Sequence, residues 1–248
     1  MAKLSLIVPV HNEAPALEKV IDRLMGSSCP IEREWIIIDD GSTDESLAIL
    51  KRLQSRYTFR LLEQKPGQGK GAAVIRGIRE SQGDIVIIQD ADLEYDPNEI
   101  PSVIQPILDD KADVVYGSRF KKNALQVHRT YHYFANRLLT LLSNLFSGIY
   151  LTDMETCYKA FRSDLIKAMN LKSQRFGIEV EMTAYLAKTD ARIDEVPISY
   201  YPRTRRQGKK INWKDGVAAL RHISYFNWCV SLKQAFTQLP TQYAPPEK

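Results

Sequence analysis

Five short apolar runs in the first half of the chain are separated by four segments with helical periodicity, and this alternation constrains the fold more than any other feature. The runs cover residues 4–10, 35–39, 59–63, 85–89 and 113–116, and the segments between them cover residues 14–25, 44–55, 69–81 and 97–108. Each segment carries apolar residues at i, i+3, i+4 spacing, which is typical of a helix that buries one face. Strands joined by crossover helices form a parallel sheet that is covered on both faces. We therefore predict an α/β fold with a mainly parallel, Rossmann-like sheet flanked by helices.

Polar residues follow three of the predicted strands directly. The sequence His-Asn-Glu occupies residues 11–13, Asp-Asp-Gly-Ser occupies residues 39–42, and Asp-Ala-Asp occupies residues 90–92. In open α/β sheets, ligands bind beyond the carboxyl ends of the strands. We expect the functional site at that edge.

The fourth strand ends in carboxylates at alternate positions, Asp90, Asp92 and Glu94. Alternate side chains of an extended chain share a face, so these three could converge on one hard cation. Mg²⁺ and Mn²⁺ are typically held by one or two carboxylates together with substrate phosphates. The alternative is a solvated turn whose aspartates cap a helix, and the position at a strand's carboxyl end favours the metal site.

A glycine-rich loop at residues 65–71 (Lys-Pro-Gly-Gln-Gly-Lys-Gly) opens the third helical segment. Its backbone amides and Lys70 could contact a diphosphate. The loop does not match the Walker A pattern, and no Gly-x-Gly follows the first strand, so a flexible turn is an equal alternative. Asp40 could accept hydrogen bonds from a nucleobase or ribose, while Ser42 or Thr43 could cap a helix.

Positive charge is concentrated in two segments that contain no Asp or Glu. Residues 114–152 carry +5 and residues 196–214 carry +6. Since the whole chain has a formal charge of +4, the remainder carries −7. Two cationic segments on an acidic body indicate an anionic partner. Nucleic acid is a poor candidate, because no aromatic-basic ribbon or recognition helix accompanies the charges.

The sequence contains no predicted signal peptide or membrane-spanning segment. The apolar run near the N-terminus is short and predicts a strand, and the longest uncharged stretch, residues 138–152, is interrupted by Ser, Asn and Gly. A spanning helix needs ~20 mostly apolar residues. Three widely spaced cysteines fit a reducing cytosol better than a disulfide framework or a zinc site.

The second half is less regular. We predict helices over residues 131–146, 177–188 and 213–230, a strand over 192–201, a loop over 202–211 and a disordered tail over 236–248. The helix over 131–146 places Phe134, Leu138, Leu141 and Leu145 on one face. That face and the aromatic helix over 213–230 could lie in a membrane interface. Core packing or a homo-oligomer contact explains either pattern equally well.

Four ordered motifs in the first 95 residues resemble the nucleotide-sugar-binding half of family 2 glycosyltransferases of the GT-A fold. They cover residues 7–13, 39–44, 69–71 and 90–92. The downstream half resembles the dolichol-phosphate/polyprenyl-phosphate mannosyltransferase branch, through residues 117–120, 152–159 and 195–198 and through Arg203 followed by residues 208–210. The resemblance covers roughly residues 3–220. His11 replaces the usual aromatic residue of the first motif.

The resemblance implies one GT-A catalytic domain over residues 1–235. Residues 1–117 would bind the nucleotide sugar, and residues 118–235 would bind the acceptor and include its interface helices. It also implies roles for individual residues. Pro9, His11, Glu13 and Asp40 would cradle the nucleoside, with Lys70 nearby and Ala91 in the donor motif; Asp90, Asp92 and Glu94 would hold Mg²⁺ or Mn²⁺; and Arg119, Arg203 and Lys210 would grip the acceptor phosphate or the leaving diphosphate.

The resemblance further implies an inverting, metal-dependent transfer of mannose or glucose from GDP-mannose or UDP-glucose to a polyprenyl or dolichyl phosphate. The enzyme would work peripherally on the cytoplasmic face of a membrane. A lipid phosphate is already anionic near pH 7 and needs no strong base, whereas a hydroxyl acceptor requires a carboxylate to remove its proton. Asp153 and Glu155 therefore keep open a second hypothesis, transfer to a saccharide hydroxyl, in which Asp153 is the base instead of an orienting residue. A third is a catalytically silent nucleotide-sugar or lipid-phosphate binding module.

Overall fold

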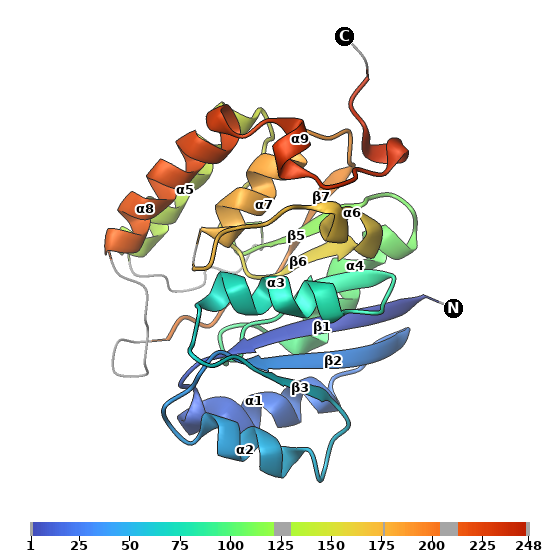
Figure 1. The fold of residues 1–248 in the computed structure, drawn as a ribbon, viewed down its shortest axis with the longest axis vertical. Coiled ribbons are helices and arrows are strands. Elements are labelled where there is room, and N and C mark those ends of the chain that lie inside the picture. The colour runs from blue at the N-terminus through green and yellow to red at the C-terminus, as the bar shows by residue number, and fades with distance from the viewer. Residues whose placement is uncertain (1, 122–129, 176, 204–212, 247–248) are drawn as a thin grey trace.

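The computed structural model describes residues 2–121, 130–175, 177–203 and 213–246 (Figure 1). Within these ranges one sheet has the strand order β3-β2-β1-β4-β6-β5-β7. The strands are β1 (Lys3–Val10), β2 (Glu32–Asp39), β3 (Arg60–Glu63), β4 (Ile85–Ile88), β5 (Val114–Ser118), β6 (Lys159–Arg162) and β7 (Ile193–Pro197). The pairing is parallel except around β6, which is antiparallel to both β4 and β5. The predicted mainly parallel sheet is confirmed. The short β6, with a charged residue at each end, was not predicted.

The helices connect and cover these strands. They are α1 (Ala14–Gly26), α2 (Ser46–Leu53), α3 (Lys70–Glu80), α4 (Ile100–Leu108), α5 (Thr130–Ser147), α6 (Ser163–Ala168), α7 (Ile178–Leu186), α8 (Trp213–Ser224) and α9 (Leu232–Ala235). The shorter turns are η1 (Pro97–Glu99) before α4, the π-helical η3 (Tyr225–Cys229) after α8, and η4 (Thr241–Tyr243). Figure 1 shows α3 in front of the sheet and α4 behind it, and α4 contacts β5 and β6.

The central strands are buried on both faces, as expected for a parallel sheet with helices on each side. In β1, the side chains of residues 4 to 8 have no exposed surface. The helix α3 contacts both β1 and β2. Its Gly77 makes the close approach possible, because a Cβ atom at that position would collide with the side chains of Ile7 and Ile38.

The topology brings the predicted motifs to one edge of the sheet. The carboxyl ends of the parallel strands lie on the left in Figure 1, on the side where α5 and α8 lie next to each other. Because β6 runs in the opposite direction, its amino end, preceded by residues 153–158, reaches the same edge. The structure therefore adds residues from the second half of the chain to the strand ends of the first half.

Helix α5 is amphipathic with its apolar face turned away from the domain. Phe134, Leu138, Leu141 and Leu145 are each more than half exposed, and Leu145 reaches 71%. On the opposite face, Thr140 is only 3% exposed. Core packing therefore does not explain the apolar pattern of α5. In the part of the chain that the structure describes, no helix is long and apolar enough to cross a membrane.

The segment predicted to be a disordered tail is packed onto the domain in the described range that ends at residue 246. Tyr243 is buried, and its hydroxyl donates a hydrogen bond to Asp164 over 3.1 Å. The backbone N–H of Asp190 donates to the carbonyl oxygen of Tyr243 over 3.0 Å, and Phe236 forms a bridge with Met169. The polar, proline-containing composition indicated disorder, but a single buried aromatic anchor fixes the segment.

Candidate functional site

The three carboxylates that follow β4 do not converge on a single point. Asp90 Oδ1 lies 2.9 Å from Lys70 Nζ, and Asp92 Oδ2 lies 2.8 Å from Arg203 Nη2. Glu94 accepts hydrogen bonds from the Tyr200 hydroxyl at 2.8 Å and from the Arg203 backbone N–H at 2.6 Å. Among the described residues, no group of three His, Cys, Asp or Glu side chains could hold a metal ion. The predicted three-carboxylate site is corrected accordingly. Glu94 is hydrogen-bonded by Tyr200 and by the Arg203 backbone, which follow β7.

Asp90 and Asp92 differ in their electrostatic surroundings. Burial opposes ionisation of Asp90, but the Lys70 ammonium lowers the pKa of Asp90 below its usual value. For Asp92, burial and the carboxylates of Asp90 and Glu94 raise the pKa to about 7, although Arg203 opposes this shift. The site thus contains a surplus of buried negative charge. A hard cation would compensate that surplus, so an Asp90–Asp92 pair completed by substrate phosphates fits Mg²⁺ or Mn²⁺.

Lys70 is shared between two carboxylates. Its ammonium lies 2.9 Å from Asp90 Oδ1 and 3.0 Å from Glu179 Oε1. Burial alone would lower the pKa of Lys70, but Asp90, Cys157 and Glu179 together raise it well above its usual value. Lys70 therefore stays cationic and holds α3 and α7 against the end of β4.

The predicted nucleoside-binding residues at the end of β1 and after it differ in their contacts. Pro9 and His11 lie at the end of β1, where His11 Nδ1 is 2.8 Å from the carbonyl oxygen of Asp40. Glu13 instead accepts from Arg203 Nη1 at 2.7 Å. Ala91 is buried between the two aspartates.

Asp40 orders the glycine-rich loop. Its Oδ1 accepts from the Gln68 backbone N–H and the Gln64 amide, at 2.7 Å and 2.9 Å, and its Oδ2 accepts from the Gly69 backbone N–H at 2.7 Å. A Cβ on Gly67 would lie 2.5 Å from the carbonyl oxygen of Asp40, so only glycine fits there. Both oxygens of this buried carboxylate thus accept hydrogen bonds from the loop, and its contact with a nucleobase or ribose stays a prediction.

Arg203 joins the two halves of the chain. Its guanidinium contacts both Glu13 and Asp92, at 2.7 Å and 2.8 Å. Its buried Nε has no hydrogen-bond partner among the residues that the structure describes. Burial would lower the pKa of Arg203, but Asp92 and Glu13 raise it. Arg203 therefore lies at the carboxylates of the donor motif, and Lys210, its predicted companion, lies outside the described residues.

Arg119 and Asp153 form a bidentate pair. Arg119 Nε donates to Oδ2 at 2.6 Å and Nη2 donates to Oδ1 at 2.7 Å, and the Arg119 backbone N–H also donates to Oδ2 at 3.0 Å. Asp153 has no exposed surface. The Arg119 guanidinium also lies 4.9 Å from the centroid of the Tyr200 ring. Both oxygens of Asp153 are occupied, which favours an orienting role over that of a base.

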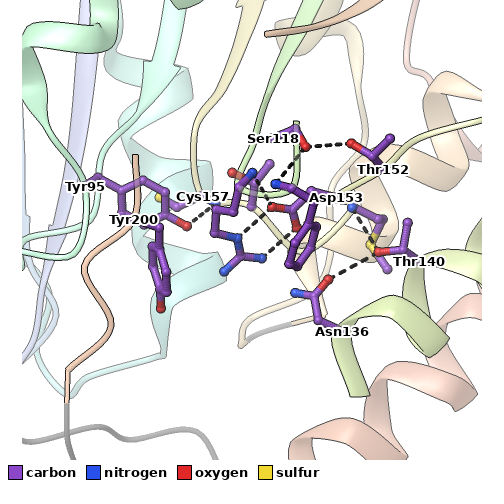
Figure 2. Close-up of polar contacts among 12 residues, drawn as sticks. Tyr95, Ser118, Asn136, Thr140, Thr152, Asp153, Cys157 and Tyr200 are labelled. Atoms are coloured by element: carbon purple, nitrogen blue, oxygen red, sulfur yellow. Dashed lines mark hydrogen bonds and ion pairs between the residues drawn. The ribbon is translucent and has the colours of Figure 1, made fainter. Parts of the chain in front are cut away.

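Polar residues from several elements surround Asp153. Figure 2 shows it among Ser118 and Thr152 on one side and, from α5, Asn136 and Thr140 on the other. The Asp153 backbone N–H donates to Glu195 Oε1 at 3.2 Å.

Sequence reasoning missed Glu179, which contacts Lys70 from the first turn of α7. The helix was predicted, but nothing in its apolar surroundings indicated a partner more than a hundred residues away. The available signal was the presence of glutamate in a mainly apolar helix. The structure buries α7 over its whole length, so such a glutamate needs a partner.

Comparison with characterised proteins places these residues in context. The chain is 26% identical over 227 residues to a dolichol-phosphate mannosyltransferase of Pyrococcus furiosus, covering 89% of this chain and 62% of that protein. It is 28% identical over 216 residues to a UDP-N-acetylglucosamine–dolichyl-phosphate N-acetylglucosaminyltransferase of Methanococcus voltae, covering 78% and 83%. It is 27% identical over 206 residues to a dodecaprenyl-phosphate galacturonate synthase of Rhizobium johnstonii, covering 81% and 60%. The chain thus spans about three fifths of the length of two of these relatives.

Solved structures share the fold. Glucosyl-3-phosphoglycerate synthase from Mycobacterium tuberculosis, in complex with Mn²⁺, UDP and phosphoglyceric acid, matches with a TM-score of 0.69 at 18% identity, covering 92% of this chain and 79% of that one. Staphylococcus aureus TarS 1–349 in complex with UDP matches with a TM-score of 0.60 at 20% identity, covering 90% and 65%. The model of glycosyl transferase family 2 matches residues 5–169. This match covers most of the chain and every motif up to β6, and it confirms the resemblance: the chain belongs to glycosyl transferase family 2.

Proposed function

We propose that the chain is a metal-dependent, inverting glycosyltransferase that moves a hexose from a nucleoside diphosphate sugar to a polyprenyl phosphate. The observation that carries this proposal is the pairing of arginine with aspartate on both sides of the site. Arg203 lies at Asp92 in the donor motif, and Arg119 is held by Asp153 in the acceptor half. Two fixed guanidinium groups suit the binding of two phosphates, whose charges otherwise repel each other.

The donor would bind in the half formed by residues 1–117. Asp90 and Asp92 would hold Mg²⁺ or Mn²⁺, and the bound cation would neutralise charge on the departing diphosphate. Lys70, which follows the loop that Asp40 orders, would face the same diphosphate. The Mn²⁺ and UDP in the glucosyl-3-phosphoglycerate synthase structure support this assignment.

The acceptor would bind in the half formed by residues 118–235. A phosphate nucleophile arrives already ionised, so the site needs cations more than a base. The Arg119–Asp153 pair meets that need, since Asp153 fixes the guanidinium and offers no oxygen for proton abstraction. The three curated relatives support a polyprenyl or dolichyl phosphate acceptor through their names, and they leave the sugar open.

The lipid chain of the acceptor requires access to a membrane, and α5 supplies a suitable surface. Its exposed apolar face lies beside α8, and η3 adds the exposed Tyr225 and Trp228. No Asp or Glu occurs over residues 114–152 or 216–246. An apolar face on carboxylate-free segments favours peripheral contact with an anionic bilayer surface, in this proposal the cytoplasmic one.

The proposal is tested by incubating the purified protein with Mn²⁺ and labelled GDP-mannose or UDP-glucose, with and without polyprenyl phosphate. Label that enters an organic-extractable, mild-acid-labile lipid only when polyprenyl phosphate is present supports the proposal. Label found only in an added oligosaccharide would instead establish transfer to a saccharide hydroxyl. Binding of donor without any transfer would identify a binding module.

A further inference from the structure

A second group of buried charges lies next to Asp90. Glu179 begins α7, Lys70 begins α3, and Glu155 and Lys159 lie just before and at the start of β6. Lys70 Nζ lies within 3.0 Å of both Asp90 and Glu179. The group is therefore continuous with the donor motif, although it comes from three separate parts of the chain.

Two carboxylate oxygens in this group have no hydrogen-bond donor among the described residues. Glu179 is 5% exposed, and while its Oε1 contacts Lys70, its buried Oε2 has no partner within the described ranges. The buried Oε1 of Glu155 likewise has no partner in the part of the chain that the structure describes. Buried polar atoms are nearly always hydrogen-bonded, so two such oxygens in one group indicate donors that a ligand supplies.

The charges of the group do not balance. Asp90, Glu155 and Glu179 outnumber the ammonium groups of Lys70 and Lys159, and the nearby guanidinium groups of Arg119 and Arg203 are each paired with another carboxylate, Asp153 or Asp92. Lys159 Nζ donates to the carbonyl oxygen of Thr156 and lies 4.9 Å from the centroid of the Tyr116 ring. An excess of carboxylate therefore remains, which attracts hydroxyl donors and repels an anion.

The position of the group matches that of the sugar in a transfer reaction. On one side Lys70 connects it to Asp90, and on the other side Glu155 follows Asp153, the ion-pair partner of Arg119, by two residues. In the proposed reaction the anomeric carbon exchanges a bond to the diphosphate for a bond to the acceptor phosphate. The sugar must therefore lie between the diphosphate at Asp90 and the acceptor at Arg119.

We propose that Glu155 and Glu179 form the sugar-ring subsite, where their unpartnered oxygens accept hydrogen bonds from the hydroxyls of a neutral hexose and exclude a hexuronic acid. The inference rests on the proposed function and adds the class of sugar. A neutral hexose donates protons to both carboxylates, whereas a uronate would bring a further carboxylate into a site that already holds an excess of them.

The first test measures binding by isothermal titration calorimetry with Mn²⁺ present. Wild-type protein is titrated with UDP, UDP-glucose and UDP-glucuronic acid, and with GDP and GDP-mannose. We expect at least one neutral-hexose donor to bind at least tenfold more tightly than UDP-glucuronic acid. Equal or tighter binding of UDP-glucuronic acid would overturn the proposed subsite. Failure of every nucleotide and nucleotide sugar to bind would refute the proposed function itself and the subsite with it.

The second test compares Glu155→Gln with a matched control, Glu181→Gln. Glu181 is buried on the same helix as Glu179, but its oxygens accept from the backbone N–H groups of Lys172 and Ser173 at 2.9 Å and 2.7 Å. We expect Glu155→Gln to weaken binding of the neutral-hexose donor about fivefold or more and to leave binding of the free nucleoside diphosphate unchanged. The ratio between the affinities for the neutral-hexose donor and for UDP-glucuronic acid should fall. Glu181→Gln should leave the ratio between the sugar donor and the free diphosphate unchanged.

The comparison of free diphosphate with sugar donor separates a sugar contact from a structural effect. If Glu155→Gln weakened both ligands equally, or neither, the assignment would be wrong. Because the wild-type discrimination between neutral and acidic donors needs no variant, the inference remains testable even if Glu155→Gln does not fold.

Discussion

Two buried aspartates of the site each pair with an arginine, and their surroundings differ. Both oxygens of Asp153 are taken by Arg119, and Glu195 accepts a hydrogen bond from the Asp153 backbone N–H. Asp92 shares Arg203 with Glu13 and has the carboxylates of Asp90 and Glu94 nearby. The comparison shows that one ion pair is complete in itself, whereas the other leaves negative charge that a bound cation can neutralise.

The largest effect is expected from Asp92→Asn, which removes the negative charge of the aspartate that pairs with Arg203. We expect a loss of turnover on the order of 10²–10³-fold, because Asp92 would help to hold the cation that stabilises the departing diphosphate. The fold should remain intact, since the substitution also relieves carboxylate repulsion. Steady-state turnover over a Mn²⁺ titration, with a melting curve, measures both. Full activity would remove Asp92 from the metal site.

Arg203→Ala tests whether the shared arginine serves the acceptor. We expect turnover to fall about 10²-fold while the Kd of the donor changes little, because the guanidinium would act on the second phosphate. Donor affinity by calorimetry and turnover by label transfer give the two values. A large loss of donor affinity would instead assign Arg203 to the leaving diphosphate.

Asp153→Asn addresses the complete pair. Leaving Arg119 buried without its carboxylate should reduce the free energy of unfolding by about 3–5 kcal/mol. The loss of turnover should be smaller than for the two preceding variants, and the acidic limb of the pH–rate profile should keep its position. Denaturant unfolding and the pH–rate profile measure these effects. Loss of the acidic limb, where the rate rises as a general base ionises, would make Asp153 a base and favour a hydroxyl acceptor.

The raised pKa of Asp92 predicts a pH-dependent response to metal. Its folded value of about 7 lies above the unfolded value of about 3.9. The folded state therefore retains a proton that the unfolded state has lost, so stability falls as pH rises from about 4 to 7. Mn²⁺ binds the ionised form and should raise Tm more at pH 7.5 than at pH 5.5, by roughly 2–4 °C for each kcal/mol of binding. Equal shifts at both pH values, or an unchanged response in Asp92→Asn, would contradict this.

The smallest effect on chemistry is expected from Leu145→Glu, which leaves both pairs untouched. Leu145 is 71% exposed, so stability and turnover with a short, water-soluble polyprenyl phosphate should stay near wild type. Binding to vesicles containing anionic lipid should weaken several-fold, because the apolar face of α5 gains a charge. Ala48→Glu, which adds the same charge to the exposed surface of α2, is the matched control in a vesicle co-sedimentation assay.

The strands and most helices could be predicted because their apolar residues recur at the spacing of the element they form. The same periodicity identifies two faces of α5 but does not indicate which face packs against the domain. In the structure Thr140 lies on the buried face and Leu145 on the exposed one. Family 2 membership also followed from the motifs. Long-range pairings could not be predicted, since the sequence around a carboxylate does not indicate which distant residue it contacts. Arg203 and Glu13, 190 positions apart, and Lys70 with Glu179 are examples.

The reversed direction of β6 has a consequence for how such a domain can diversify. The chain leaves the sheet at Ser118, the end of β5, and re-enters it at Lys159, the start of β6, and both points lie at the same edge. The intervening segment, which carries Arg119, α5 and Asp153, is therefore an excursion that begins and ends beside the site. Its length and composition can change at little cost to strand register, because lengthening a surface connection costs little loop entropy. The segment between β5 and β6 can thus change as a unit while the strand ends of the first half stay constant.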